Sequence, residues 1–219
     1  LIIKIYFNCK IILTPIRHRE KIFVMRLFTI LLILIFSLQF STKADDISEF
    51  EIEGITLYDS ALKYFSVNDL QEDVVDSYTS DKYSTSAIWQ GLNEYDYLQL
   101  SYKTGDPNYV LQDISGTKRI NYNECLKELD QIEKEISSLY EDNSNIKNDG
   151  KISYNHPADK SGNSKVTDIA WIFQNGDVIV IQCYNWQTAF GKKNKFRDSL
   201  KIAISNKDID KWFSHEAYN

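Results

Sequence analysis

The sequence predicts an α+β domain in which helices pack on one face of a largely antiparallel sheet. Two runs rich in Val, Ile, Trp and Phe flank Asn175-Gly176, a dipeptide that tolerates the positive φ of tight hairpin turns. Residues 95–103 and 196–204 alternate between apolar and polar side chains, as half-buried strands do. Residues 121–140 instead carry apolar side chains at helical spacing. Hairpins and separate helices of this kind are typical of the α+β class.

The first part of the domain is expected to contain two short helices followed by three strands. Thr56 with Asp59, and Ser66 with Asp69, have the spacing of helix amino-terminal caps. Such side chains accept hydrogen bonds from the free N–H groups of the first turn. The expected helices span residues 57–65 and 67–77. The expected strands span residues 84–90, 95–103 and 108–115.

The longest predicted helix spans residues 121–140. Asn121 and Glu124 resemble a capping box at its start. Its apolar stripe consists of Cys125, Leu129, Ile132, Ile136 and Leu139. The polar stretch 141–164 that follows is long for an ordered loop, so we expect it to be either mobile or functional.

The central hairpin, residues 165–186, is expected to turn through a two-residue type I′ loop at Asn175-Gly176. This register pairs Phe173 with Val178 and Trp171 with Val180 on one face. The opposite face, expected to meet the helices, then contains Ile172, Ile179, Ile181 and Cys183. Both faces are apolar near the turn. The Trp171/Phe173 face is therefore either covered, by the rest of the fold or by a second subunit, or exposed to a partner; we favour coverage because large exposed apolar patches are rare in monomers.

A strand over residues 196–204 and a short helix over 209–215, capped by Ser205 and Asp208, are expected to end the domain. The predicted elements then fall into two α-then-β halves, residues 54–115 and 121–204. This order suggests a duplicated unit.

The first 44 residues have the order of an export signal. Met25, the only methionine, precedes Arg26, an apolar run from Leu27 to Phe40 and a group of small residues, as in a secretory signal peptide. The apolar run is shorter than the roughly 20 residues that a membrane-spanning helix needs. We expect residues 1–24 to be untranslated upstream sequence and 25–44 to be a signal peptide. Residues 45–219 would then form a single exported domain, periplasmic or extracellular, with no stable membrane anchor after cleavage.

The composition of residues 45–219 limits the partners of the domain. This segment has 18 Lys and Arg against 30 Asp and Glu. The excess of acidic side chains argues against nucleic acid and against anionic membrane surfaces as partners. The segment retains two cysteines, Cys125 and Cys183, which an exported protein can join in a disulfide. We expect this disulfide; the alternative is two buried free thiols.

No catalytic, metal or cofactor motif withstands inspection. Cys125 near a helix start could act as a thiol nucleophile with His156 or His215, but no catalytic Cys-His signature surrounds them. Residues 145–150 contain the glycine of a calcium loop, but Lys147 stands at a ligand position. The many carboxylates could include a glycosidase pair, but a solvated acidic surface explains them better. We therefore predict no catalytic residue, no metal ligand and no cofactor.

An aromatic surface on one side of the sheet is the candidate binding site. Aromatic and Arg side chains are enriched where interfaces have hot spots. The predicted site residues are Trp171, Phe173, Trp186, Tyr95, Tyr97, Arg197 and Lys201. The leading hypothesis is a non-catalytic exported module that binds a protein or a small ligand through this face. The alternatives are a periplasmic hydrolase and a structural protein whose apolar face forms a homodimer.

Two resemblances bear on these hypotheses. The stretches Ala44-Asp45-Asp46-Ile47, Phe50 to Ile55 and Asp59 to Ser66 resemble the start of uncharacterised secreted proteins of marine alphaproteobacteria, which implies export. Gly54-Ile55-Thr56 ahead of a helix pair and a strand meander remotely resembles the repeat of the BLIP and SmpA/OmlA group, which implies a non-enzymatic binding module. The chain departs from that group after its first helix, where Phe65-Ser66-Val67-Asn68 replaces a Gly-x-Pro. It also has no lipid-attachment Cys close after the apolar run of residues 27–40.

Overall fold

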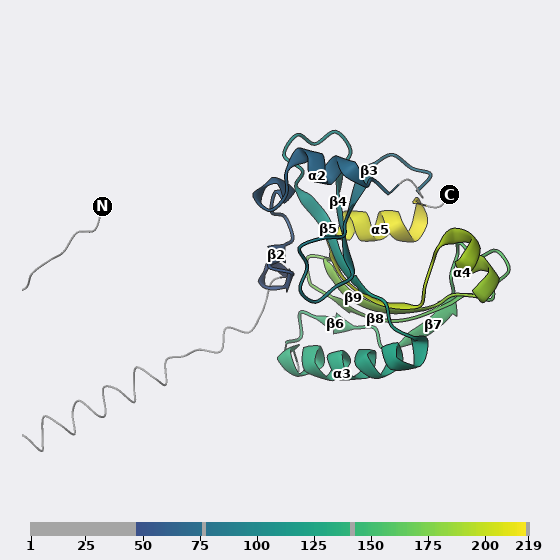
Figure 1. Cartoon of the computed structure of the whole chain (residues 1–219). Coiled ribbons are helices and arrows are strands. Elements are labelled where there is room, and N and C mark those ends of the chain that lie inside the picture. The colour runs from purple at the N-terminus through teal and green to yellow at the C-terminus, as the bar shows by residue number, and fades with distance from the viewer. Residues whose placement is uncertain (1–46, 76–77, 141–142, 218–219) are drawn as a thin grey trace, which may run out of the picture. The chain divides into compact units, whose positions relative to one another are not determined.

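The computed structural model describes residues 47–75, 78–140 and 143–217 (Figure 1). The expected upstream segment 1–24 and signal peptide 25–44 lie outside these residues. The chain divides into two compact units, Leu1–Thr42 and Lys43–Asn219, and every described residue belongs to the second.

The described residues form one large antiparallel sheet, a small two-stranded ribbon, four α-helices and two 3-10 helices. The sheet has eight strands in the order β3-β4-β5-β10-β9-β8-β6, and β7 also pairs with β8. The strands are β3 (Tyr83–Ile88), β4 (Tyr97–Lys103), β5 (Leu111–Lys118), β6 (Lys147–Asn148), β7 (Ile152–Asn155), β8 (Lys165–Ile172), β9 (Val178–Asn185) and β10 (Ser199–Ser205). A separate two-stranded ribbon joins β1 (Glu51–Ile52) to β2 (Ile55–Thr56). The α+β class and the largely antiparallel sheet are thus confirmed.

The sheet consists of two meanders that meet at its centre. β3, β4 and β5 form the first meander, β8, β9 and β10 form the second, and β5 pairs with β10 between them. A helix precedes each meander, which is the order expected from the sequence. The helical elements are η1 (Ile47–Glu49), η2 (Ala61–Lys63), α2 (Val67–Glu72), α3 (Tyr122–Tyr140), α4 (Thr188–Asn194) and α5 (Lys207–His215).

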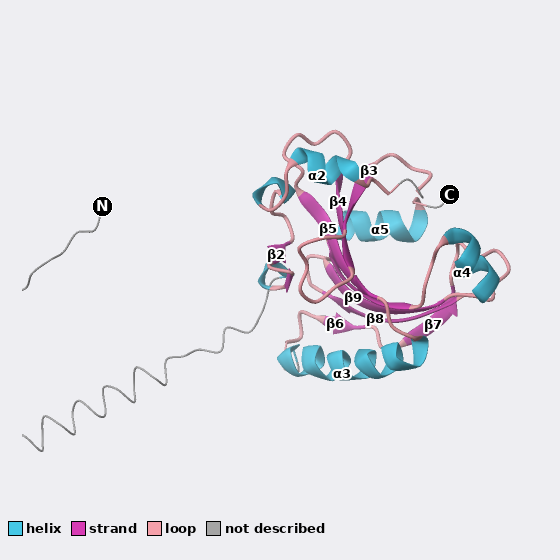
Figure 2. Cartoon of the chain, viewed as in Figure 1, coloured by secondary structure: helices cyan, strands magenta, loops and turns pink. Residues whose placement is uncertain are grey.

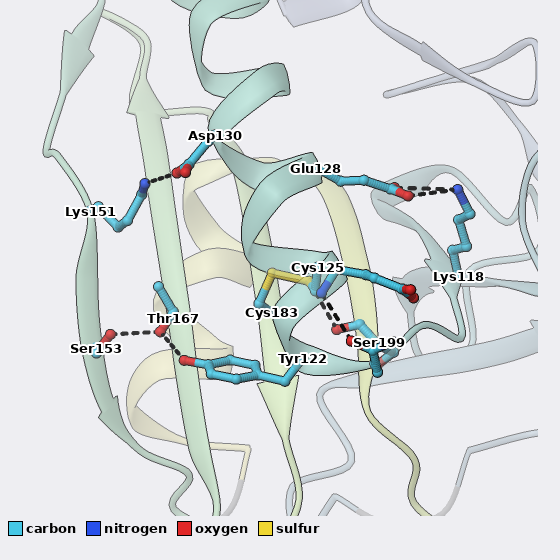
Figure 3. Close-up of a disulfide and its surroundings, with 12 residues drawn as sticks. Lys118, Tyr122, Cys125, Glu128, Asp130, Lys151, Ser153, Thr167, Cys183 and Ser199 are labelled. Carbon is cyan, nitrogen blue, oxygen red and sulfur yellow. Dashed lines mark hydrogen bonds and ion pairs between the residues drawn. A yellow bond between two sulfur atoms is a disulfide. The ribbon is translucent and has the colours of Figure 1, made fainter.

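Helix α3 lies across β9 and β10 on one side of the sheet, which we call the α3 face (Figure 3). A disulfide joins Cys125 of α3 to Cys183 of β9, as predicted. The Tyr122 hydroxyl lies 2.7 Å from the Thr167 hydroxyl on β8. These contacts fix the start of α3 against two strands of the second meander.

Helix α5 lies on the opposite side of the sheet, the α5 face, so the prediction that helices share one face is wrong (Figure 2). The cause is the sequence of β10. Leu200 and Ile204 are large and buried on the α3 face, whereas Ala203 and Ser205 alternate with them and leave room for a helix on the other side. Asn206 then starts α5 directly, because its side-chain oxygen accepts bonds from the next N–H groups at 3.0 Å.

Each face of the sheet has its own apolar cluster. The α3 face holds the larger cluster, which includes Leu70, Leu100, Ile114, Leu129, Ile169, Trp171 and Ile181. The α5 face holds a smaller cluster of Tyr83, Ile209, Trp212 and Ala217, against which Tyr78 and Phe213 pack. The rest of the α5 face carries apolar side chains together with polar ones, and a cavity lies there.

The register of the β8–β9 hairpin differs from the prediction by one residue. Ile172 pairs with Val178 and Trp171 with Ile179. The Phe173 N–H donates to the Asp177 carbonyl at 2.9 Å, and the Gly176 N–H donates to the Phe173 carbonyl at 2.8 Å. The turn is therefore a three-residue loop with Gly176 at φ 90°, rather than a two-residue type I′ loop.

The side chain of Asp177 explains this longer loop. Its carboxylate accepts hydrogen bonds from the Tyr58 hydroxyl at 2.7 Å and from the Asn175 amide at 2.8 Å. A one-residue change of register moves side chains to the other face. Trp171 and Phe173 consequently join Ile179 and Ile181 in the core of the α3 face.

Candidate functional site

A cavity of about 520 Å³ opens on the α5 face, between the second meander and α5. Its apolar wall comes from alternate positions of β8 and β9, including Ala170, Ile172 and Val180. Its polar groups include Asp113, Asp149, His156, Asp168, Gln182, Lys201 and Asp210. We call this cavity the Lys201 pocket. Its volume lies within the range of pockets that hold small organic ligands.

Lys201 is the cation of this pocket. It stands in the middle of β10, opposite Thr117 on one side and Gln182 on the other. Its Nζ atom lies 3.4 Å from the Gln99 side-chain oxygen and 5.9 Å from the centre of the Phe213 ring. Burial lowers the pKa of Lys201, and the nearby Asp113 opposes this shift. Within the part of the chain that the structure describes, Lys201 has no ion pair within 4.0 Å.

Two buried carboxyl groups that line the Lys201 pocket accept hydrogen bonds from neighbouring hydroxyl groups. Asp113 accepts from the Ser205 hydroxyl at 2.6 Å, and Asp168 accepts from the Tyr154 hydroxyl at 2.8 Å. Burial raises the pKa of both groups, since it disfavours the charged form. Hydroxyl donors therefore already use part of the hydrogen-bonding capacity of each carboxyl group.

The carboxyl group of Asp210, on α5, differs from these two because no hydroxyl group donates a hydrogen bond to it among the described residues. Burial raises its pKa as well, and the charge of His215 partly opposes the shift. Among the described residues its carboxyl group has neither a hydrogen bond nor an ion pair. The Lys201 pocket thus contains one acceptor group, Asp210, and one donor group, Lys201, whose polar capacity the protein leaves largely unused.

His156 closes the pocket on the side of β7. Its ring lies 4.4 Å from the Trp186 ring centre and 5.7 Å from that of Tyr184. The Ala158 N–H donates to Nδ1 of His156 at 3.1 Å, which requires that nitrogen to be unprotonated. Burial, aided by the charge of Lys201, lowers the pKa of His156 to about 4.

This buried imidazole should make the protein less stable as the pH falls. The pKa of His156 is about 4 in the folded state against 6.5 for the unperturbed group, so the unfolded chain binds the proton more tightly. The free energy of unfolding should therefore decrease between about pH 6.5 and pH 4, by at most about 3 kcal/mol. A His156→Gln variant should lack this contribution when urea unfolding is measured across that range.

The matched control is His215→Gln, which removes an exposed histidine; the decrease in stability that is specific to His156 should persist in this variant. Carboxyl groups that do not interact with His156 titrate in both proteins and cancel in the comparison. Parallel pH profiles for His156→Gln and the wild type would contradict the burial of a neutral imidazole.

The structure does not gather the predicted site residues on one surface. Trp171 and Phe173 are 1% and 4% exposed and belong to the core. Tyr95 covers Gly116, where an added Cβ would lie 2.5 Å from its ring. The remaining four residues lie outside the buried core: Lys201 in the Lys201 pocket, Trp186 and Arg197 in a second cavity, and Tyr97 against Trp89.

Sequence reasoning missed the acidic groups and the histidine of the pocket. Asp113, Asp168 and Asp210 are unremarkable among many carboxylates, because sequence does not show which of them share a cavity. One signal was available. Asp168, Gln182 and Lys201 are polar residues that interrupt otherwise apolar strands, and such interruptions fall on the α5 face.

The structure also bears on the thiol nucleophile and the metal site that the sequence raised as alternatives. The sulfur of Cys125 is bonded to Cys183, so it is not a thiol nucleophile in this state. Lys147, at the failed ligand position, forms an ion pair with Asp149 at 2.5 Å. In the described ranges no three His, Cys, Asp or Glu side chains gather as metal ligands would. None of the helices in those ranges has the length and apolar character to cross a membrane.

Comparison of the chain with protein-family models, with curated proteins and with solved structures gives no match. The function is therefore inferred from the geometry and charge of the sites themselves.

Proposed function

We propose that this protein is an exported binding module that holds a small polar molecule in the Lys201 pocket. The observation that carries the proposal is the Lys201 ammonium group, which faces a cavity, is partly desolvated and has no ion pair among the described residues. A desolvated cation is costly unless it is paired. An anionic group of a ligand would supply that pair.

The pocket also suggests which molecule it takes. The ligand would place a carboxylate or similar group at Lys201 and a hydrogen-bond donor at Asp210, with an apolar part along Ala170, Ile172 and Val180. A zwitterion with an apolar side chain, such as a free amino acid or a short peptide, has all three features. Convergent polar groups in a largely apolar pocket are typical of small-molecule sites.

Two further observations support export and binding over catalysis. The buried Cys125–Cys183 disulfide fits an oxidising compartment, which agrees with the signal peptide expected at residues 25–44. The remote resemblance to the BLIP and SmpA/OmlA group favours a binding module. The hydrolase hypothesis loses its thiol version as long as the disulfide is intact.

The proposal is tested on protein recovered from a periplasm under non-reducing conditions. Thermal unfolding is followed with a panel of amino acids and dipeptides, and native mass spectrometry reports any co-purified mass. A ligand at about 100 times its Kd should add roughly 2.7 kcal/mol to the free energy of unfolding and raise Tm by several degrees. The Lys201→Met variant should fold but lose this shift and the co-purified mass.

Lys211→Met is the matched control, because Lys211 is exposed on α5 and does not line the pocket. It should behave as the wild type. A folded Lys201→Met variant that retains the bound mass or the thermal shift would refute the assignment. So would a bare wild-type dimer that no member of the panel stabilises, which would favour the structural alternative.

A further inference from the structure

Four cations line a second cavity of about 560 Å³ at one end of the sheet. They are Arg119, which follows β5, and Lys192, Lys195 and Arg197, which belong to α4 or follow it. We call this cavity the Arg119 pocket. Trp186 and Phe196 also line it, and Asp198 is its one acidic residue.

The charge of the Arg119 pocket is not balanced by the protein. The Asp198 carboxylate, which accepts a hydrogen bond from the Trp186 backbone N–H at 2.9 Å, offsets only one of the four positive charges of the lining residues. The ion pairs found within the described residues involve Lys63, Lys82, Lys118, Lys147 and Lys151, and therefore none of the four cations. Residues 45–219 carry 30 acidic and 18 basic side chains, so this local excess of positive charge is opposite in sign to the rest of the domain.

Helix ends alone do not explain the cluster. Lys192 lies in the last turn of α4, where the helix dipole favours a cation. Arg119 and Arg197 lie outside α4 and gain nothing from that dipole. The four cations are exposed side chains that line one cavity, so a bound anion would interact with several of them at once.

Aromatic rings hold the cavity wall in place. The Arg119 guanidinium lies 5.5 Å from the Trp89 ring centre and 5.9 Å from that of Tyr97. The Trp186 ring stacks on Tyr184 with an interplanar angle of 8° and on Phe190 with one of 15°. Since neighbouring rings already stack on the indole, it does not offer a free platform for a sugar ring. Recognition here must depend on charge.

We propose that the Arg119 pocket binds a small, multiply charged oxyanion. Guanidinium groups match carboxylate and phosphate oxygens with paired hydrogen bonds, which Arg119 and Arg197 would provide. Lys192 and Lys195 would neutralise the remaining charge. The site is separate from the Lys201 pocket and does not depend on the function proposed for that pocket.

Isothermal titration of the periplasmic protein with inorganic pyrophosphate and, separately, with citrate tests this proposal and distinguishes phosphate from carboxylate chemistry. At least one probe should bind, and its affinity should fall as salt is added. The double substitution Arg119→Gln with Arg197→Gln should weaken binding about tenfold or more. It should leave any mass bound in the Lys201 pocket in place.

The matched control is Lys103→Gln with Lys127→Gln, which removes the same charge from exposed positions away from the cavity. It should keep the affinity within about twofold, because neither lysine lines the cavity. An equal loss of affinity in the control would show that only the net charge of the protein matters, and would overturn the proposed site. Absence of binding by both probes, or binding only of a long polyanion such as heparin, would also overturn it.

Discussion

Removal of the Cys125–Cys183 disulfide should lower the free energy of unfolding by about 4 kcal/mol. The two cysteines are 58 residues apart, and closing a loop of that length in the unfolded chain removes conformational entropy of this size. Small domains have total stabilities of only about 5–15 kcal/mol, so the loss is a large fraction of the whole. The double variant Cys125→Ala with Cys183→Ala, unfolded in urea, measures it.

Two controls separate the crosslink from packing. Both cysteines are fully buried, so the alanine substitutions also remove two sulfur atoms from the core. The wild-type protein with its disulfide reduced keeps these atoms and should lose a similar free energy. If reduction leaves the urea midpoint unchanged, the bridge does not constrain the unfolded chain and the prediction fails.

The disulfide also illustrates what could be predicted from sequence. Cys125 was placed on the apolar stripe of its helix by periodicity, and Cys183 on an inward strand position. Strand alternation continued to place Cys183 on the helix side although the register was wrong, because Ile179, Ile181 and Cys183 share a face in either register. Features that depend on a period within one element are therefore predictable.

Features that depend on one side chain reaching across the fold were not predictable. Asn175-Gly176 favours a two-residue turn, yet the bonds that Tyr58 and Lys207 make to Asp177 accompany a longer loop. Likewise, the small residues of β10 leave room on one face, but the side that α5 takes after Asn206 also depends on contacts with distant residues such as Tyr83. The predicted aromatic site is wrong because of this longer loop: the change of register places Trp171 and Phe173 in the core.

Replacement of Trp171 by alanine should cost about 3–5 kcal/mol of stability, the usual range for removing a large buried aromatic side chain. Trp171 is 1% exposed and lies in the cluster beneath α3. Its Nε1–H has no hydrogen-bond partner among the described residues. A Trp171→Phe variant keeps most of the ring and removes that unpaired donor, so it should recover most of the loss.

Trp89→Ala is the control of the same residue type. Trp89 is 46% exposed, so its removal should cost about 1 kcal/mol or less, including the hydrogen bond that it donates to Asp73. The comparison decides between the two interpretations of the Trp171/Phe173 face. Near-equal stability of Trp171→Ala and Trp89→Ala would mean that Trp171 is not core, and would restore the exposed aromatic surface as a binding site. A loss confined to Trp171→Ala leaves the Lys201 and Arg119 pockets as the places where a ligand should be sought.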